Sequence, residues 1–126
     1  MNSDTMLLRQ VHPSFIQNGR VSSQAFRPTP KDRSLLSVYD GEQIGPAAAH
    51  DHYTGTLGLP SIGVMGVQVR ECEALDLPAR LDPTPFREHA VIDFSDHGRK
   101  ATERKAKQLR VRAEHRDWLY RELYAG

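Results

Sequence analysis

Four polar side chains in the first half of the chain are of the types that nucleophilic catalysis needs: His12, Ser23, Arg27 and His50. A serine hydroxyl becomes reactive when a nearby imidazole accepts its proton. A guanidinium binds phosphate oxygens through paired hydrogen bonds. Because Arg9 precedes these residues on the first predicted strand, this part of the chain could line a cleft for a phosphate-bearing ligand. One hypothesis is therefore a small enzyme acting on a nucleotide or RNA through a cleft of His, Ser and Arg.

The histidines and serines also have an ordinary explanation, because no complete motif contains them. The sequence has no G-x-S-x-G turn, and no G-x-G-x-x-G loop follows a predicted strand. Zinc needs three or four ligands, and neither H-E-x-x-H nor C-x-x-C occurs. His50 and His52 would share a face only on a strand, whereas their segment is predicted to be helical. The sequence therefore predicts no metal site and no cofactor.

Positive charge is concentrated near the end of the sequence. Residues 1–98 contain eight Lys and Arg against twelve Asp and Glu, a balance of −4, whereas residues 99–126 contain nine against four, a balance of +5. This asymmetry indicates an anionic partner for the basic segment. The alternatives are a nucleic acid, a protein, or a helix face that is simply solvated. The residues predicted to contact a partner are Arg104, Lys105, Lys107, Arg110, Val111, Arg112 and Trp118.

The basic segment is predicted to be one helix over residues 99–124. A step of 100° per residue places small and apolar residues on one stripe, while Val111 and Trp118 fall on the opposite side. Either the helix breaks near His115 and Trp118 turns inward, or it is continuous and both residues are apolar anchors of an interface. The first functional hypothesis is thus a small interaction or accessory protein that uses this helix. The predicted inner stripe consists of Thr102, Ala106, Leu109, Ala113, Tyr120 and Leu123.

Five segments before this helix have the apolar patterns of strands. Turn signals such as Asn18-Gly19 and Asp40-Gly41 separate them. A proline followed by three alanines predicts a short helix over residues 46–53. Because the strands precede the long helix, we expect an α+β fold with a small, mainly antiparallel sheet of four or five short strands and the helix packed on one face. The predicted strands are Met6–His12, Val21–Arg27, Leu35–Asp40, Ile62–Val69 and His89–Phe94.

Alternation on the last of these strands predicts which side chains share a face. Ala90, Ile92 and Phe94 fall on one side of the sheet, and His89 falls on the other. Residues 71–85 contain several prolines, so we expect one short helical turn there, followed by a loop.

Composition narrows the class of protein. The 126 residues predict one domain, with a sheet-forming body over 1–98 and the helix over 99–124. With Cys72 as the only cysteine, no disulfide can form within the chain. No apolar run approaches the roughly 20 residues of a membrane span, and no secretory signal begins the sequence, so we expect a cytoplasmic location and no membrane contact. Thirteen arginines against four lysines are typical of a GC-rich bacterial genome.

Overall fold

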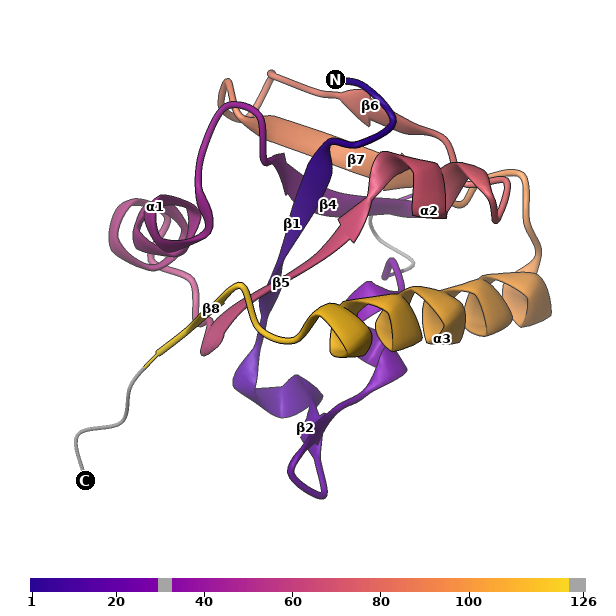
Figure 1. Cartoon of the computed structure of the whole chain (residues 1–126), viewed down its shortest axis with the longest axis horizontal. Coiled ribbons are helices and arrows are strands. Elements are labelled where there is room, and N and C mark those ends of the chain that lie inside the picture. Colours follow the sequence, from indigo (N-terminus) through magenta and orange to yellow (C-terminus); the bar gives the residue numbers. More distant parts are fainter. Residues whose placement is uncertain (30–32, 123–126) are drawn as a thin grey trace.

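The chain folds around a curled antiparallel sheet. The computed structural model describes residues 1–29 and 33–122, and within them six strands follow the order β6-β7-β4-β1-β5-β8 (Figure 1). A separate hairpin pairs β2 (Ile16–Gln17) with β3 (Arg20–Val21). The α+β class is confirmed, and the sheet has more strands than predicted. The strands of the main sheet are β1 (Met6–Val11), β4 (Leu35–Asp40), β5 (Gly63–Gln68), β6 (Ala79–Leu81), β7 (His89–Asp93) and β8 (Tyr120–Arg121).

One face of the sheet packs against the long helix α3 (Arg99–Arg116). A short 3-10 helix, η2 (Ser23–Phe26), lies in the same layer and contacts α3. The expected inner stripe of the helix is correct over its middle, where Ala106, Leu109 and Ala113 are fully buried. Burial of this stripe fixes α3 against the sheet and leaves its opposite side exposed to water.

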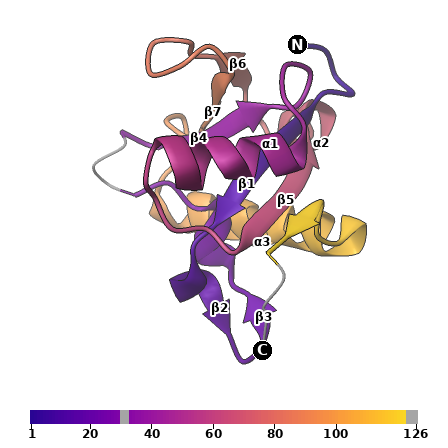
Figure 2. The ribbon, with the colours of Figure 1, turned by 90° about the vertical axis from the view of Figure 1, so that its left-hand side faces the viewer.

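The other face of the sheet packs against a second, smaller group of elements. Helix α1 (Pro46–Asp51) continues as one wider turn, η4 (His52–Thr56), in front of β1 and β5 (Figure 2). Ala49 of α1 packs with Leu8 and Tyr39 in this smaller core. The two helical layers therefore cover opposite faces of one sheet.

Two predicted elements differ from the structure in the middle of the chain. The strand predicted over residues 21–27 is present only at Val21, which belongs to β3. Ser23–Phe26 form the 3-10 helix η2 instead, because the amides of Ala25 and Arg27 donate to the nearby carbonyls of Ser22 and Gln24. The loop expected after the short helix α2 (Val69–Glu73) contains β6, an edge strand of three residues paired with β7.

The C-terminal helix is shorter than predicted. It begins at Arg99 as expected, but Asp117 has a positive φ of 68° and ends it. The chain then turns back, and Tyr120 pairs with Val64 of β5 as strand β8. The helix therefore breaks, as one alternative allowed, and Trp118 packs against the core instead of extending the helix. Leu123, predicted on the inner stripe, lies outside the described residues. Within residues 1–29 and 33–122, no helix is long and apolar enough to cross a membrane.

Candidate functional site

The residues of the sequence-predicted catalytic cleft have partners in different parts of the fold. His12 lies after β1, where its Nδ1 accepts a hydrogen bond from the backbone amide of Ser14 at 2.9 Å. Ser23 begins η2, in the layer that contacts α3. Arg27 ends the same turn and lies 3.4 Å from Glu103 of α3.

His50 belongs to the opposite layer. Its Nε2 lies 2.9 Å from the carbonyl oxygen of Ser61 and 3.4 Å from Glu122. Its ring packs on Tyr120 of β8, with centroids 4.8 Å apart. The structure therefore places Ser23 and Arg27 on the α3 side, where they line separate hollows, and places His50 in the opposite layer.

Several cations of α3 are held by the protein itself. Arg110 lies 3.6 Å from Glu114, which also accepts both hydrogen bonds of the Arg20 guanidinium. The Lys105 ammonium donates to the carbonyl oxygen of Leu75 at 2.5 Å. Lys105 and Arg110, both predicted to contact a partner, therefore have internal roles.

Four exposed cations of α3 have no hydrogen bond or ion pair within the described residues: Lys100 in its first turn and three further along the helix. Arg104, Lys107 and Arg112 are exposed, and none of them has a hydrogen bond or an ion pair with another residue in the described part of the chain. Val111 lies among them with 44% of its surface exposed. A groove of about 370 Å³ runs beside these residues between α2 and α3. Of the predicted anchors, Val111 is exposed, whereas Trp118 packs on the core with Arg121 over its ring at 5.1 Å.

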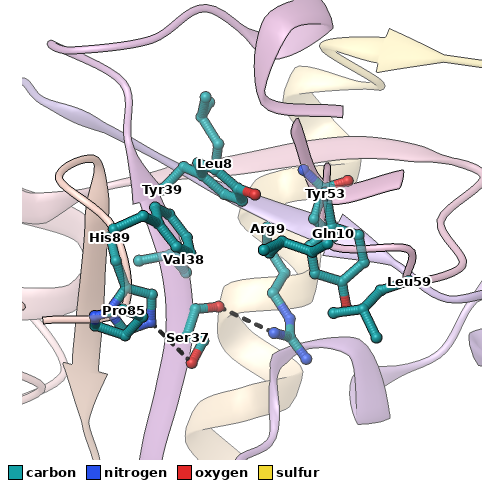
Figure 3. A pocket seen from close by; sticks show the side chains of 12 residues that line it. Leu8, Arg9, Gln10, Ser37, Val38, Tyr39, Tyr53, Leu59, Pro85 and His89 are labelled. Atoms are coloured by element: carbon teal, nitrogen blue, oxygen red, sulfur yellow. Dashed lines mark hydrogen bonds between the residues drawn. The ribbon is translucent and has the colours of Figure 1, made fainter. Parts of the chain in front are cut away.

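A cavity of about 390 Å³ lies on the other face of the sheet. Residues of β1 and β4 form its floor, and the turn after α1 and the loop before β7 form its walls (Figure 3). Its lining combines aromatic and aliphatic side chains with a few polar groups, which is typical of small-molecule sites. The residues are Leu8, Arg9, Gln10, Ser37, Val38, Tyr39, Tyr53, Leu57, Leu59, Pro85, Phe86 and His89.

Ser37 and His89 contact one another in this cavity. The Ser37 hydroxyl oxygen lies 3.1 Å from His89 Nε2 (Figure 3). His89 Nδ1 lies 2.9 Å from the carbonyl oxygen of Asp82 and 3.3 Å from its carboxylate. The backbone carbonyl of Ser37 accepts a hydrogen bond from Arg9 Nη1 at 2.9 Å. The Ser37 hydroxyl, the His89 imidazole and the Asp82 carboxylate thus form a chain of contacts, of which Ser37 and His89 line the cavity.

Gln10 contributes a buried polar group to the same lining. Only 5% of its surface is exposed, and its Oε1 accepts a hydrogen bond from the Ser61 hydroxyl at 2.7 Å. Its Nε2 has no hydrogen-bond partner among the residues that the structure describes. Exchange of the two amide atoms would leave the oxygen without a donor instead, so one polar atom is unsatisfied in either placement. Such buried groups are uncommon and point to a missing partner.

Tyr39 of β4 contributes an aromatic ring to the lining of the cavity. Its hydroxyl lies 2.7 Å from His52 Nδ1, and its ring packs on Phe86 with centroids 5.0 Å apart. Burial raises the pKa of Tyr39, with smaller contributions from Tyr53 and Glu88. The phenol of Tyr39 therefore keeps its proton at neutral pH.

A metal site is not part of this arrangement. No group of three or more His, Cys, Asp and Glu side chains within residues 1–29 and 33–122 could hold a metal ion. Comparison with protein families, with curated proteins and with solved structures finds no match to this chain. The chemistry of the side chains is thus the basis for a functional proposal.

Proposed function

We propose that this is an interaction protein whose α3 surface binds an acidic segment of a protein partner. The observation that carries the proposal is the set of three exposed cations, Arg104, Lys107 and Arg112, which surround the exposed Val111. Lys105, Arg110 and Arg116 of α3 instead have carbonyl or carboxylate partners within the chain. Positive charge without an internal partner is available to an external anion.

A protein segment fits this surface better than a nucleic acid does. The groove beside α3 is lined by Leu75 and Val111 together with the cations Lys107 and Arg112. Its lining also includes Glu71, whose carboxylate is paired with Arg116 at 3.0 Å. An acidic segment with one apolar side chain would match both the charge and the groove. Surfaces that bind single-stranded nucleic acids instead combine cations with aromatic side chains that stack on bases. The one tryptophan is packed against the core, away from such a role.

The hypothesis of an enzyme built on His12, Ser23, Arg27 and His50 has no comparable support. Ser23 and Arg27 belong to η2 and its end, in the layer of α3, whereas His50 contacts Ser61 in the opposite layer and His12 accepts from the amide of Ser14. We therefore do not adopt it as a second candidate function.

The test is a charge reversal that leaves the fold intact. The variant Lys107→Glu/Arg112→Glu changes two exposed cations, whereas Lys105 and Arg110 are kept because they contact Leu75 and Glu114. The matched control, Arg33→Glu/Arg87→Glu, makes the same change in charge at exposed positions outside α2 and α3. Each protein is used to capture partners from nuclease-treated host lysate, and the bound proteins are identified by mass spectrometry.

We expect an acidic protein to be recovered with the wild type and the control but not with Lys107→Glu/Arg112→Glu. Binding should weaken as salt is raised, because mobile ions screen exposed charges. The same bound proteins with all three baits would contradict the proposal. Binding that is found in untreated lysate but is lost after nuclease treatment would instead indicate a nucleic acid.

A further inference from the structure

We propose that Ser37, His89 and Asp82 form a nucleophilic site that hydrolyses small carboxylic esters in the cavity on the α1 face. Ser37 is the nucleophile, His89 is its general base, and Asp82 positions the imidazole. The contacts follow the order that this chemistry requires: 3.1 Å from the hydroxyl to Nε2, then 2.9 and 3.3 Å from Nδ1 to the carbonyl and carboxylate oxygens of Asp82.

The two oxygens of Asp82 determine where the imidazole carries its proton. Both can only accept a hydrogen bond, so Nδ1 must be the nitrogen that donates. Neutral His89 then has a lone pair on Nε2, and the Ser37 hydroxyl donates to it. This is the arrangement in which an imidazole can remove the proton of a nucleophile.

Ser37 and His89 differ in how much of each residue is exposed to solvent. Ser37 is exposed at the cavity, whereas only 7% of the surface of His89 is exposed. Phe86 packs edge-on against His89, with ring centroids 5.2 Å apart. A ligand can therefore reach the hydroxyl while the base is held in one orientation by its neighbours.

The cavity also supplies a donor for the negative charge of an ester reaction. Attack on a carbonyl carbon places charge on its oxygen, and buried hydrogen-bond donors stabilise that charge. Gln10 lines the cavity, and when its Oε1 accepts from Ser61, its buried Nε2 is a donor without a partner in the described chain that a turn of the side chain would bring to a ligand. The volume of about 390 Å³ lies at the lower end of small-molecule sites, which favours short-chain esters.

The reaction proceeds in two steps, acylation of Ser37 and hydrolysis of the acyl-serine. First, Ser37 Oγ forms a bond to the ester carbonyl carbon, and its proton passes to His89 Nε2. The bond from that carbon to the alcohol oxygen then breaks, and the alcohol leaves with the proton from Nε2. Second, water attacks the acyl-serine, His89 accepts the water proton and returns it to Ser37 Oγ, and the carboxylic acid is released.

A fluorophosphonate probe tests the nucleophile directly. The full chain is incubated with the probe, and the modified residue is located by mass spectrometry, while hydrolysis of p-nitrophenyl butyrate is followed in parallel. We expect one adduct, on Ser37, and loss of both labelling and hydrolysis in Ser37→Ala. Ser37 is exposed, so the circular dichroism of this variant should match that of the wild type, while loss of the hydrogen bond to buried His89 should lower its melting temperature by only a few degrees. Ser23→Ala is the matched control and should keep both activities.

Asp82→Asn tests the positioning residue. The backbone carbonyl that holds His89 is retained, so the fold should persist, but labelling should slow by at least tenfold because the imidazolium loses its carboxylate partner. The proposal is overturned if Ser37 is unlabelled, if Ser23 is labelled equally, or if Ser37→Ala hydrolyses the ester at the wild-type rate. An Asp82→Asn variant labelled at the wild-type rate would overturn the role of Asp82.

Discussion

Cys72 lies on the buried side of α2, packs in the core and is fully buried. Burial, with a smaller contribution from the charges of Glu71 and Glu73, raises the pKa of its thiol to about 12. Because the thiolate is the reactive form, the folded protein should not react with a chromogenic disulfide reagent at pH 8. In denaturant, one equivalent should react. Rapid reaction of the folded protein would show that this part of the core opens readily.

Asp93 at the end of β7 offers a prediction about pH. Hydrogen bonds from Ser95 and then from Arg80 lower the pKa of Asp93 to about 2. The unfolded-state pKa is roughly 3.9. The ionised carboxylate therefore stabilises the fold above about pH 4, and this contribution is lost as the pH falls toward 2. Asp93→Asn should lower the free energy of unfolding at pH 6 by about 1 to 2 kcal/mol.

Urea denaturation at pH 6, 4 and 3 checks this prediction. The difference between the wild type and Asp93→Asn should narrow as the pH falls. Asp96→Asn is the control, since Asp96 is exposed and has no ion pair in the described chain. A difference that stays constant with pH would mean that the carboxylate charge is not the cause.

The Ser37–His89 contact shows why the candidate site could not be predicted in full. Alternation on residues 89–94 placed His89 on the face opposite Ala90 and Ile92, and the structure agrees. Its partner depends on strand register: Tyr39 pairs with His89, and Ser37 lies two residues along the same face. The contact between Ser37 and His89 joins positions 52 residues apart, and no local sequence pattern determines it.

At the scale of elements, Gly63 controls how closely β8 approaches β5. A Cβ atom at this position would lie 2.6 Å from the backbone oxygen of Tyr120 and 2.8 Å from the Trp118 ring. Gly63→Ala should therefore displace β8 and destabilise the protein by about 1 to 3 kcal/mol. Emission from the single tryptophan should shift to longer wavelength as Trp118 becomes more exposed.

Gly55→Ala is the matched control for Gly63→Ala. A Cβ atom on Gly55 would have no atom of the described chain within 4 Å, apart from its own helical neighbours. Denaturation curves and emission spectra of the two variants provide the comparison. Equal effects, or none at Gly63, would show that β8 is not tightly packed on β5.

The elements differ in how much of them the sequence predicts. The segments 35–40 and 89–93 are apolar and bounded by turns, and they form strands very close to the predicted ones. By contrast, Asp117 ends α3 in a left-handed conformation that usually belongs to glycine. Without a glycine or proline there, the helical pattern continues into Tyr120. The strand β8 was therefore missed because tertiary pairing with β5 overrides local preference.

At the scale of the whole molecule, the two proposed sites lie on different sides of the sheet. The groove with Lys107 and Arg112 borders α3, whereas the cavity with Ser37 lies on the face covered by α1. We predict that Lys107→Glu/Arg112→Glu keeps fluorophosphonate labelling within twofold of the wild type. Ser37→Ala should keep partner capture unchanged. Probe labelling and pull-down of both variants decide this, and loss of both properties in either variant would show that the sites are coupled.

Strand order has a consequence for how the protein is made. β1 is synthesised early and lies between β4 and β5, while the strand that covers the outer side of β5 is β8. During translation, a nascent chain that has emerged only as far as Arg116 contains all of α3 but leaves one side of β5 unpaired. Open strand edges pair readily with other chains. Ribosomal pausing or proteolysis just after Arg116 should thus yield an aggregation-prone species, although nearly the whole core sequence is already present.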